Sequence, residues 1–259
     1  VTWASWFAAA IVPGLLSCTV VPWIAYRILE PEVTSTPEAP IFAAGELRQM
    51  GPLSRDEWVT LIVFGGVGLM WITSAWHRLD VTFVAMVGIG VLLASGTLTW
   101  QAASGERAAW DVFVWYGGML QMGDLLNRTG STRVLAENVA GLFVGIPWVI
   151  VLVAILIIYF YAHYFFASIT AHMLAMFPPF VAVLIGIGVP PQLAVYSLLC
   201  TANLTAGLTH YGTTTGPILF GVGYVTRGDW WKVGFYTSVA NIVIWLTAGA
   251  AWWKWLGFW

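Results

Sequence analysis

Charged side chains are scarce in this sequence. Asp, Glu, Lys and Arg account for only 8% of the 259 residues, whereas apolar and aromatic residues account for 59%. The mean hydropathy is accordingly high, at +0.82. A water-soluble domain is about one-quarter charged, and long apolar runs left in water would promote aggregation. The composition therefore excludes an ordinary soluble domain and predicts an integral membrane protein.

Metal-binding side chains are also few. The two cysteines, Cys18 and Cys200, lie in separate apolar runs, and there are four histidines. His172 follows His163 by nine residues, whereas zinc sites favour His pairs about three to five residues apart. We therefore expect no metal, no other cofactor and no catalytic residues. A membrane enzyme that uses these histidines and a bound metal is kept as an alternative, and it should lose activity on chelation.

Acidic residues avoid the apolar interiors. All twelve can be placed in loops or near helix ends, whereas a proton pump usually keeps a carboxylate within the membrane. The groups left at mid-depth are hydroxyls, amides, imidazoles and main-chain N–H groups, which suit an anionic guest.

Apolar segments predict an all-α protein with several membrane spans, because about 20 residues cross the hydrocarbon core. The segments cover about 3–26, 58–76, 81–98, 109–126, 147–167, 171–189, 191–209, 216–225 and 233–256. Residues 127–146 look interfacial. The polar stretch 30–57, which includes TSTPEAP, is the one long connector. An excess of basic residues places this connector on the cytoplasmic side.

Two of these segments are interrupted at mid-depth. The run 147–189 is apolar but has His163, Ser168, Thr170 and His172 at its centre, which predicts two arms of a re-entrant hairpin. The segment 191–225 is broken at GLTHYGTTTGP, where glycines relax the backbone and Pro217 suits a helix start. Non-helical backbone is tolerated in a membrane only where protein buries it or it lines a wet cavity, so a hairpin beside a broken helix indicates a binding site.

Helix starts after the two interruptions could bind carboxylates, because the first N–H groups of a helix are unpaired and lie at its positive end. One start lies near Ser168–Thr170 and the other near Thr214–Pro217. Asn203 could coordinate substrate or bond across helices, and the histidines could line the site or simply pack. The substrate-binding residues that we predict are Ser168, Thr170, His172, Asn203, Thr209, His210, Thr213, Thr214 and Thr215.

Two long motifs resemble one transporter family. The runs YFYAHYFFASITAHMLAMFPPF and TANLTAGLTHYGTTTGPILFGVGYVTRGDWWKVGF, together with GPLSRDEW in the connector, resemble the divalent-anion:sodium symporter superfamily, in its citrate/succinate and 2-oxoglutarate/malate exchanger branch. The resemblance covers the whole chain and corresponds to the C-terminal half of such a transporter, one half of an inverted repeat.

The resemblance implies a site built from a hairpin tip and a helix break. Ser168, Ile169 and Thr170 correspond to the family's Ser-Asn-Thr tip, and Gly212, Thr213 and Thr214 to the break. In sodium-coupled members both loops also hold a sodium ion, here at Ser168 and Gly212. Ile169 replaces the usual Asn and has no oxygen to offer, which argues against a sodium site and favours obligate exchange.

The resemblance also implies a division of labour between parts of the chain. Residues 1–108 would be mainly scaffold helices with the connector 30–57, residues 109–225 mainly an elevator-like transport domain, and 226–259 the last transmembrane helix. The expected partners are a carboxylate substrate, the lipid bilayer, the N-terminal half of the transporter and a second copy in a homodimer, with no nucleic acid. The chain alone is not expected to transport.

The function predicted is secondary transport, by exchange, of malate, succinate, 2-oxoglutarate or citrate. We expect no enzyme activity and an integral location in a bacterial inner membrane, with a plastid or other organellar inner membrane as the second choice. An accessory or structural membrane subunit is the alternative, and it should form a stable complex without binding solutes.

Overall fold

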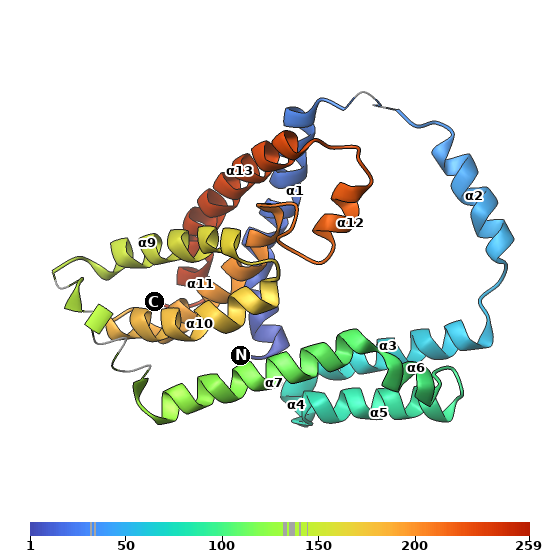
Figure 1. Cartoon of the computed structure of the whole chain (residues 1–259), viewed down its shortest axis with the longest axis horizontal. Coiled ribbons are helices and arrows are strands. Elements are labelled where there is room, and N and C mark those ends of the chain that lie inside the picture. The colour runs from blue at the N-terminus through green and yellow to red at the C-terminus, as the bar shows by residue number, and fades with distance from the viewer. Residues whose placement is uncertain (32, 34, 132–133, 135–137, 140, 144) are drawn as a thin grey trace. The chain divides into compact units, whose positions relative to one another are not determined.

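Helices and turns make up the described chain, in which no β-strand occurs (Figure 1). The computed structural model describes all residues except 32, 34, 132–133, 135–137, 140 and 144, and at several positions of α7 it describes the backbone alone. The all-α prediction is confirmed. The segment 127–146, predicted to be interfacial, falls partly on the residues outside this description.

Contacts divide the helices into two units, each described here by itself. The first unit, Val1–Trp6 with Pro31–Asp111, contains α2 (Ala39–Met50), α3 (Arg55–Ile72), α4 (Ser74–His77), α5 (Val81–Ala94) and α6 (Trp100–Gly105). The second, Phe7–Glu30 with Val112–Trp259, contains most of α1 (Trp3–Leu29) and of α7 (Arg107–Arg128), followed by α9 (Trp148–Tyr161), η1 (Ala162–Phe165), α10 (Ile169–Gly186), α11 (Pro191–Leu204), η2 (Thr205–Gly207), α12 (Gly216–Gly221), α13 (Arg227–Ile244), the π-helical η3 (Trp245–Gly249) and α14 (Ala250–Trp255).

Side-chain caps fix where the helices of the first unit begin. Ser54 and Glu57 form a reciprocal capping box at the start of α3, and the Asp80 carboxylate accepts from two main-chain N–H groups at the start of α5. Such caps satisfy donors that a helix leaves unpaired. The predicted span 58–76 begins earlier and is divided into α3 and α4, and the predicted span 81–98 ends at Ala94.

The connector 30–57 is not wholly irregular, because it contains the twelve-residue helix α2. This helix buries none of its residues. A solvated helix such as α2 lacks a long apolar run, so the apolar pattern of the sequence does not predict it.

Within the described residues, four helical stretches are long and apolar enough to cross a membrane: Trp3–Leu29, Trp148–Phe165, Ile169–Gly186 and Arg227–Trp255. The last begins six residues before the predicted 233 because Thr226 caps it, accepting from the Asp229 N–H at 3.1 Å. These stretches agree with the integral membrane protein predicted from composition.

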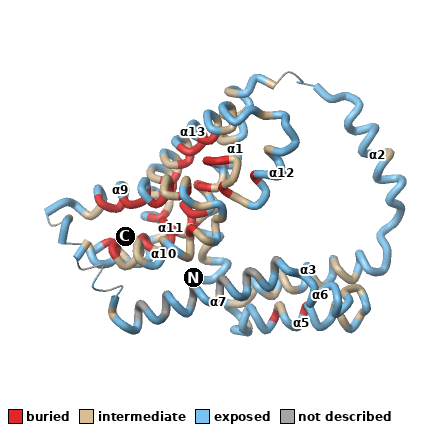
Figure 2. The backbone as a smooth tube through the Cα atoms, viewed as in Figure 1, coloured by how far each residue is buried: buried red, intermediate tan, exposed pale blue. Residues whose placement is uncertain are grey.

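Buried residues of the second unit gather on α9, α10, α11 and α13 (Figure 2). In α11, Leu193, Ala194, Leu198 and Ala202 are at most 3% exposed, and α11 packs against both α9 and α10. The core of this unit therefore lies around the predicted hairpin.

Tryptophan hydrogen bonds join α1 to the last helices. The Trp245 indole donates to Ser17 Oγ at 3.0 Å, and the Trp253 indole donates to the Ala9 carbonyl at 2.9 Å. Contacts thus group α1 and α13 with the hairpin. The predicted division of the chain into a scaffold and a moving transport domain describes how the parts move between conformations. It stays a prediction.

Candidate functional site

The first interruption is a non-helical turn between α9 and α10. Helix α9 passes into the 3₁₀ turn η1, and Ser168 then adopts an extended backbone, with φ −151° and ψ 131°. Its Oγ accepts from the Ala171 N–H at 3.4 Å and starts α10. Within the described chain, the N–H groups of Ile169 and Thr170 have no hydrogen-bond partner. The predicted interruption at 160–172 is confirmed, and it leaves main-chain donors at its tip.

The second interruption separates α11 and η2 from α12. Between them, Thr213 Oγ1 accepts from the N–H groups of Thr215 and Gly216, both at 3.1 Å. The predicted break at 207–217 is therefore confirmed. The half-helix after it ends at Gly221 rather than at the predicted 225, because Gly223 takes a left-handed φ of +82° that terminates helices. Such a short helix adds little dipole, so the hydroxyls are the main donors here.

Two hydrogen bonds join the two interruptions directly. His163 Nε2 lies 2.8 Å from the Gly212 carbonyl, and the Tyr211 hydroxyl donates to the Tyr164 carbonyl at 3.0 Å. Because a carbonyl only accepts, His163 Nε2 carries a proton. Residues 49 apart in sequence thereby bring the hairpin turn against the helix break.

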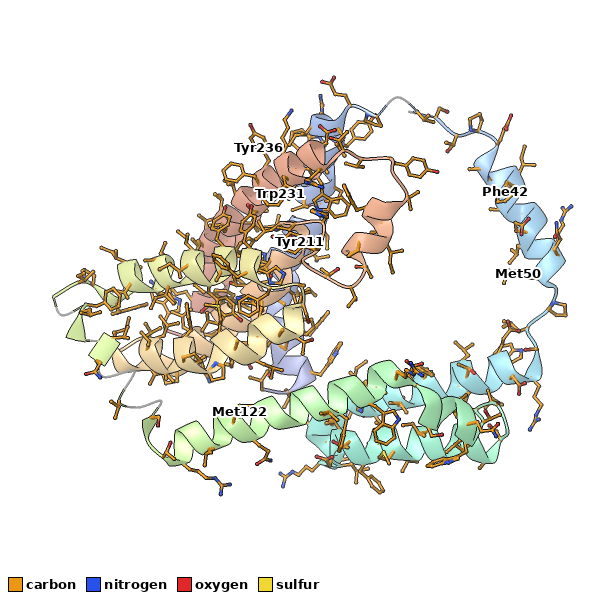
Figure 3. The ribbon with its side chains drawn as sticks, in the orientation of Figure 1. Phe42, Met50, Met122, Tyr211, Trp231 and Tyr236 are labelled. Carbon is orange, nitrogen blue, oxygen red and sulfur yellow. The ribbon has the colours of Figure 1, made fainter. Side chains whose placement is uncertain are left out.

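Aromatic contacts extend this junction to α13. The rings of Tyr164 and Trp231 lie 5.5 Å apart between centroids, and the Trp231 indole donates to His210 Nδ1 at 3.3 Å. Tyr211 and Trp231 are labelled near one another in Figure 3. Tyr161 also bonds Ser238 Oγ at 3.0 Å. The tip, the break and α13 therefore support one another.

Gly212 is closely packed at this junction. A Cβ atom at that position would lie 3.1 Å from each of three atoms: the Ala206 carbonyl oxygen, His163 Nε2 and Thr209 Oγ1. That is tighter than an ordinary contact. The missing side chain at Gly212 therefore favours the close approach of the break to His163.

His172 lies behind the tip and is fully buried. Its ring packs against Tyr159 at 4.4 Å and against His163 and Phe166 at 5.1 Å, between centroids. Neither nitrogen of the buried His172 ring has a hydrogen-bond partner within the described residues. In this conformation His172 therefore supports the tip from within.

The predicted site residues differ in accessibility. Those open to solvent or lipid are Thr170, Asn203, Thr214 and Thr215, those half-buried are Ser168, His210 and Thr213, and those buried are His172, Thr209 and Gly212. Asn203 lines a cavity of about 320 Å³ with Ser17 of α1 and with Gly234 and Asn241 of α13. Gly207 and Leu208, at the start of the break, also line this cavity, and no residue of the tip does.

Metal ligands do not cluster within the described residues, where no group of three or more His, Cys, Asp or Glu could hold an ion. Both cysteines are free thiols.

Three residues of the junction, Tyr164, Tyr211 and Trp231, were not among the predicted site residues, and His163 was predicted only as a histidine that could line the site or pack. The only sequence signal was that His163 and Tyr211 each lie inside an interrupted segment. Nothing in the sequence indicates that one faces the other, because their contact depends on how the helices pack.

Comparison with known proteins gives a match over the whole chain. The family described as the sodium:sulfate symporter transmembrane region matches residues 1–259. Dicarboxylate transporter 1, chloroplastic, of Arabidopsis thaliana is 42% identical over 99% of this chain and 46% of its own length. Dicarboxylate transporter 2.1, chloroplastic, of the same plant is 35% identical over 98% of this chain and 46% of its own length.

A bacterial protein is similar over the same range. Inner membrane protein YbhI of Escherichia coli is 33% identical over 100% of this chain and 54% of its own length. The chain thus spans about half the length of the curated relatives it matches.

Proposed function

The chain belongs to the family of the sodium:sulfate symporter transmembrane region, and on this premise we propose that it forms one half of a carboxylate carrier. The carrier exchanges di- or tricarboxylates such as malate, succinate, 2-oxoglutarate or citrate across a membrane and is not an enzyme. Support for the substrate class comes from relatives named dicarboxylate transporters. The divalent-anion:sodium symporter superfamily, which the two sequence motifs resemble, agrees with this family match.

The observation that carries the proposal is the joining of hairpin tip and helix break by His163 and Tyr211. The tip contributes the N–H groups of Ile169 and Thr170 and the hydroxyls of Ser168 and Thr170. The break contributes the Thr214 hydroxyl and the hydroxyls of Thr213 and Thr215, which bond one another at 2.8 Å. Both sets consist of neutral donors, which a carboxylate needs.

Several such donors can offset the removal of a carboxylate from water. A hydrogen bond to a charged group contributes about 1.5–3 kcal/mol, and α10, with 18 residues, adds the positive end of its dipole. One carboxylate would lie at this half of the site. The second would be bound by an equivalent tip and break in the N-terminal half of the carrier.

The carrier works as a homodimer in which a transport domain moves against a scaffold, as the resemblance implies. Relatives of both kinds, bacterial and chloroplastic, support a bacterial inner membrane first and a plastid or other organellar inner membrane second. Sodium is not required, because the side chain of Ile169, the first residue of α10, presents no oxygen where the family has Asn.

Uptake into proteoliposomes tests the proposal. The protein at its full length should take up labelled malate or citrate faster when unlabelled counter-substrate is inside the vesicles. Absence of counter-substrate-stimulated uptake for every acid of this class would contradict the function.

Two substitutions test the site assignment in the same assay. Thr170→Ala and Thr214→Ala each remove an exposed hydroxyl and should lower uptake at low substrate concentration. Thr19→Ala is the matched control, because this exposed threonine bonds only to carbonyls of its own helix α1. Wild-type kinetics in both site variants would remove these residues from the site.

A further inference from the structure

One buried histidine connects the two substrate-facing loops of the proposed site. His163 has no exposed surface, and its Nε2–H donates to the Gly212 carbonyl at 2.8 Å. Gly212 is itself buried, and its main-chain N–H bonds the Thr209 carbonyl at 3.3 Å. The Gly212 carbonyl, which accepts the hydrogen bond from His163, therefore belongs to a hydrogen-bonded turn at the centre of the break.

We propose that His163 is a positioning residue that holds the hairpin tip and the helix break as one substrate-binding unit. The inference rests on the proposed function and deepens it. His163 does not reach substrate, because it is fully enclosed. It acts through Gly212 on one side and through η1, which leads into the tip, on the other.

The physical reason lies in the environment of this hydrogen bond. In a water-excluded core a polar group that loses its partner is strongly penalised, and the Gly212 carbonyl, buried with its residue, would have no water to replace the imidazole. The bond therefore resists separation of the two loops. Tyr211 adds a second, half-buried connection to the Tyr164 carbonyl.

Three variants distinguish the effect of losing the N–H donor of His163 from the effect of changing the shape of its side chain. His163→Phe keeps a flat ring and removes the donor. His163→Gln places an amide N–H at a reach similar to Nε2 and should restore much of the function. His77→Phe is the matched control, because His77 Nε2 makes the same kind of bond, 2.7 Å from the Met70 carbonyl, in the first unit.

Transport kinetics give the first readout, with labelled malate and citrate as the probes. His163→Phe should raise the apparent KM about three- to tenfold, the range expected for one lost hydrogen bond, and change Vmax per folded protein less than twofold. His163→Gln should lie between His163→Phe and wild type, and His77→Phe should match wild type. An unchanged KM with a lower Vmax would overturn the positioning role.

Hydrogen exchange without substrate gives the second readout, which does not depend on transport. His163→Phe should speed amide exchange in both 162–172 and 207–216, and His77→Phe in neither. If wild type transports no carboxylate, the proposed function fails while this readout still tests the connection. Faster exchange in the tip alone, with the break unchanged, would overturn the inference.

A milder pair of variants covers the case in which His163→Phe does not fold. His163→Gln and Tyr211→Phe each weaken one connection, and the double variant should speed exchange in both loops more than either single change. Wild-type exchange in the double variant would count against the inference.

Discussion

At the scale of single residues, Gly234 shows how closely α13 approaches the helix break. A Cβ atom there would lie 2.7 Å from the Gly207 carbonyl oxygen and 2.8 Å from that of Leu208. Both are main-chain atoms, so no side-chain rotation can relieve the clash. Close approach of this helix therefore depends on the missing side chain.

Gly234→Ala should destabilise the protein by about 1–3 kcal/mol, the usual range for overpacking a closely packed site. Thermal unfolding in detergent measures the effect. Gly228→Ala is the control in the same helix, where the nearest atom to an added Cβ is Thr226 Oγ1 at 3.8 Å. That variant should be as stable as wild type or more so, because Ala is the better helix former; an equal loss in both would contradict the packing argument.

At the scale of helical elements, the first unit begins two helices with carboxylate caps. The Ser54 main-chain N–H, and then its hydroxyl, hold the pKa of Glu57 below its ordinary value. The N–H groups of Phe83 and Thr82 do the same to the pKa of Asp80. A carboxyl whose pKa is lowered by folding stabilises the folded state above its unfolded pKa, and the contribution is lost as the pH falls through the lowered value.

Asp80→Asn tests this sign, because Asn is also a good cap but does not titrate. Wild type should have the higher Tm at neutral pH, and the difference should shrink as the pH falls through the lowered pKa of Asp80. Glu38→Gln is the matched control, since Glu38 precedes α2 without a side-chain cap bond. A difference between wild type and Asp80→Asn that stays constant with pH would contradict the role of the carboxylate.

At the scale of the whole molecule, the ion requirement of the proposed carrier follows from one position of its tip. Ile169 begins α10 and is half-buried, and its side chain offers no ligand to a cation. In the proposed carrier, hydrogen-bond donors balance the carboxylate, which suits exchange of one anion for another.

Replacement of all sodium by potassium should leave counter-substrate-stimulated uptake unchanged within about twofold, a difference of roughly 0.4 kcal/mol. Uptake into proteoliposomes with the same internal substrate measures this directly. Loss of uptake in potassium would show that sodium is bound without the oxygen of an Asn at 169.

Local chemistry determined much of what could be predicted. The scarcity of charge required a membrane, and Ser168, the glycines after Leu204 and Pro217 marked where helices stop and start, because caps and turns depend on a few adjacent residues. Prediction failed at α2, whose twelve solvated residues lack the apolar run that was sought, and at the end of α12, where Gly223 stops the helix early.

Tertiary structure alone decided which of the interrupted segments' residues meet. His163 and Gly212 are 49 residues apart, and nothing in either neighbourhood indicates the other. The burial of His172 and the position of Asn203 beside α1 and α13 likewise come from the packing of several helices. Sequence by itself determined the membrane class and the two breaks, because these depend on composition and short-range backbone preferences, and its resemblance to a known family placed both breaks at one site. The particular contacts that join the breaks were decided by long-range packing, which no local pattern encodes.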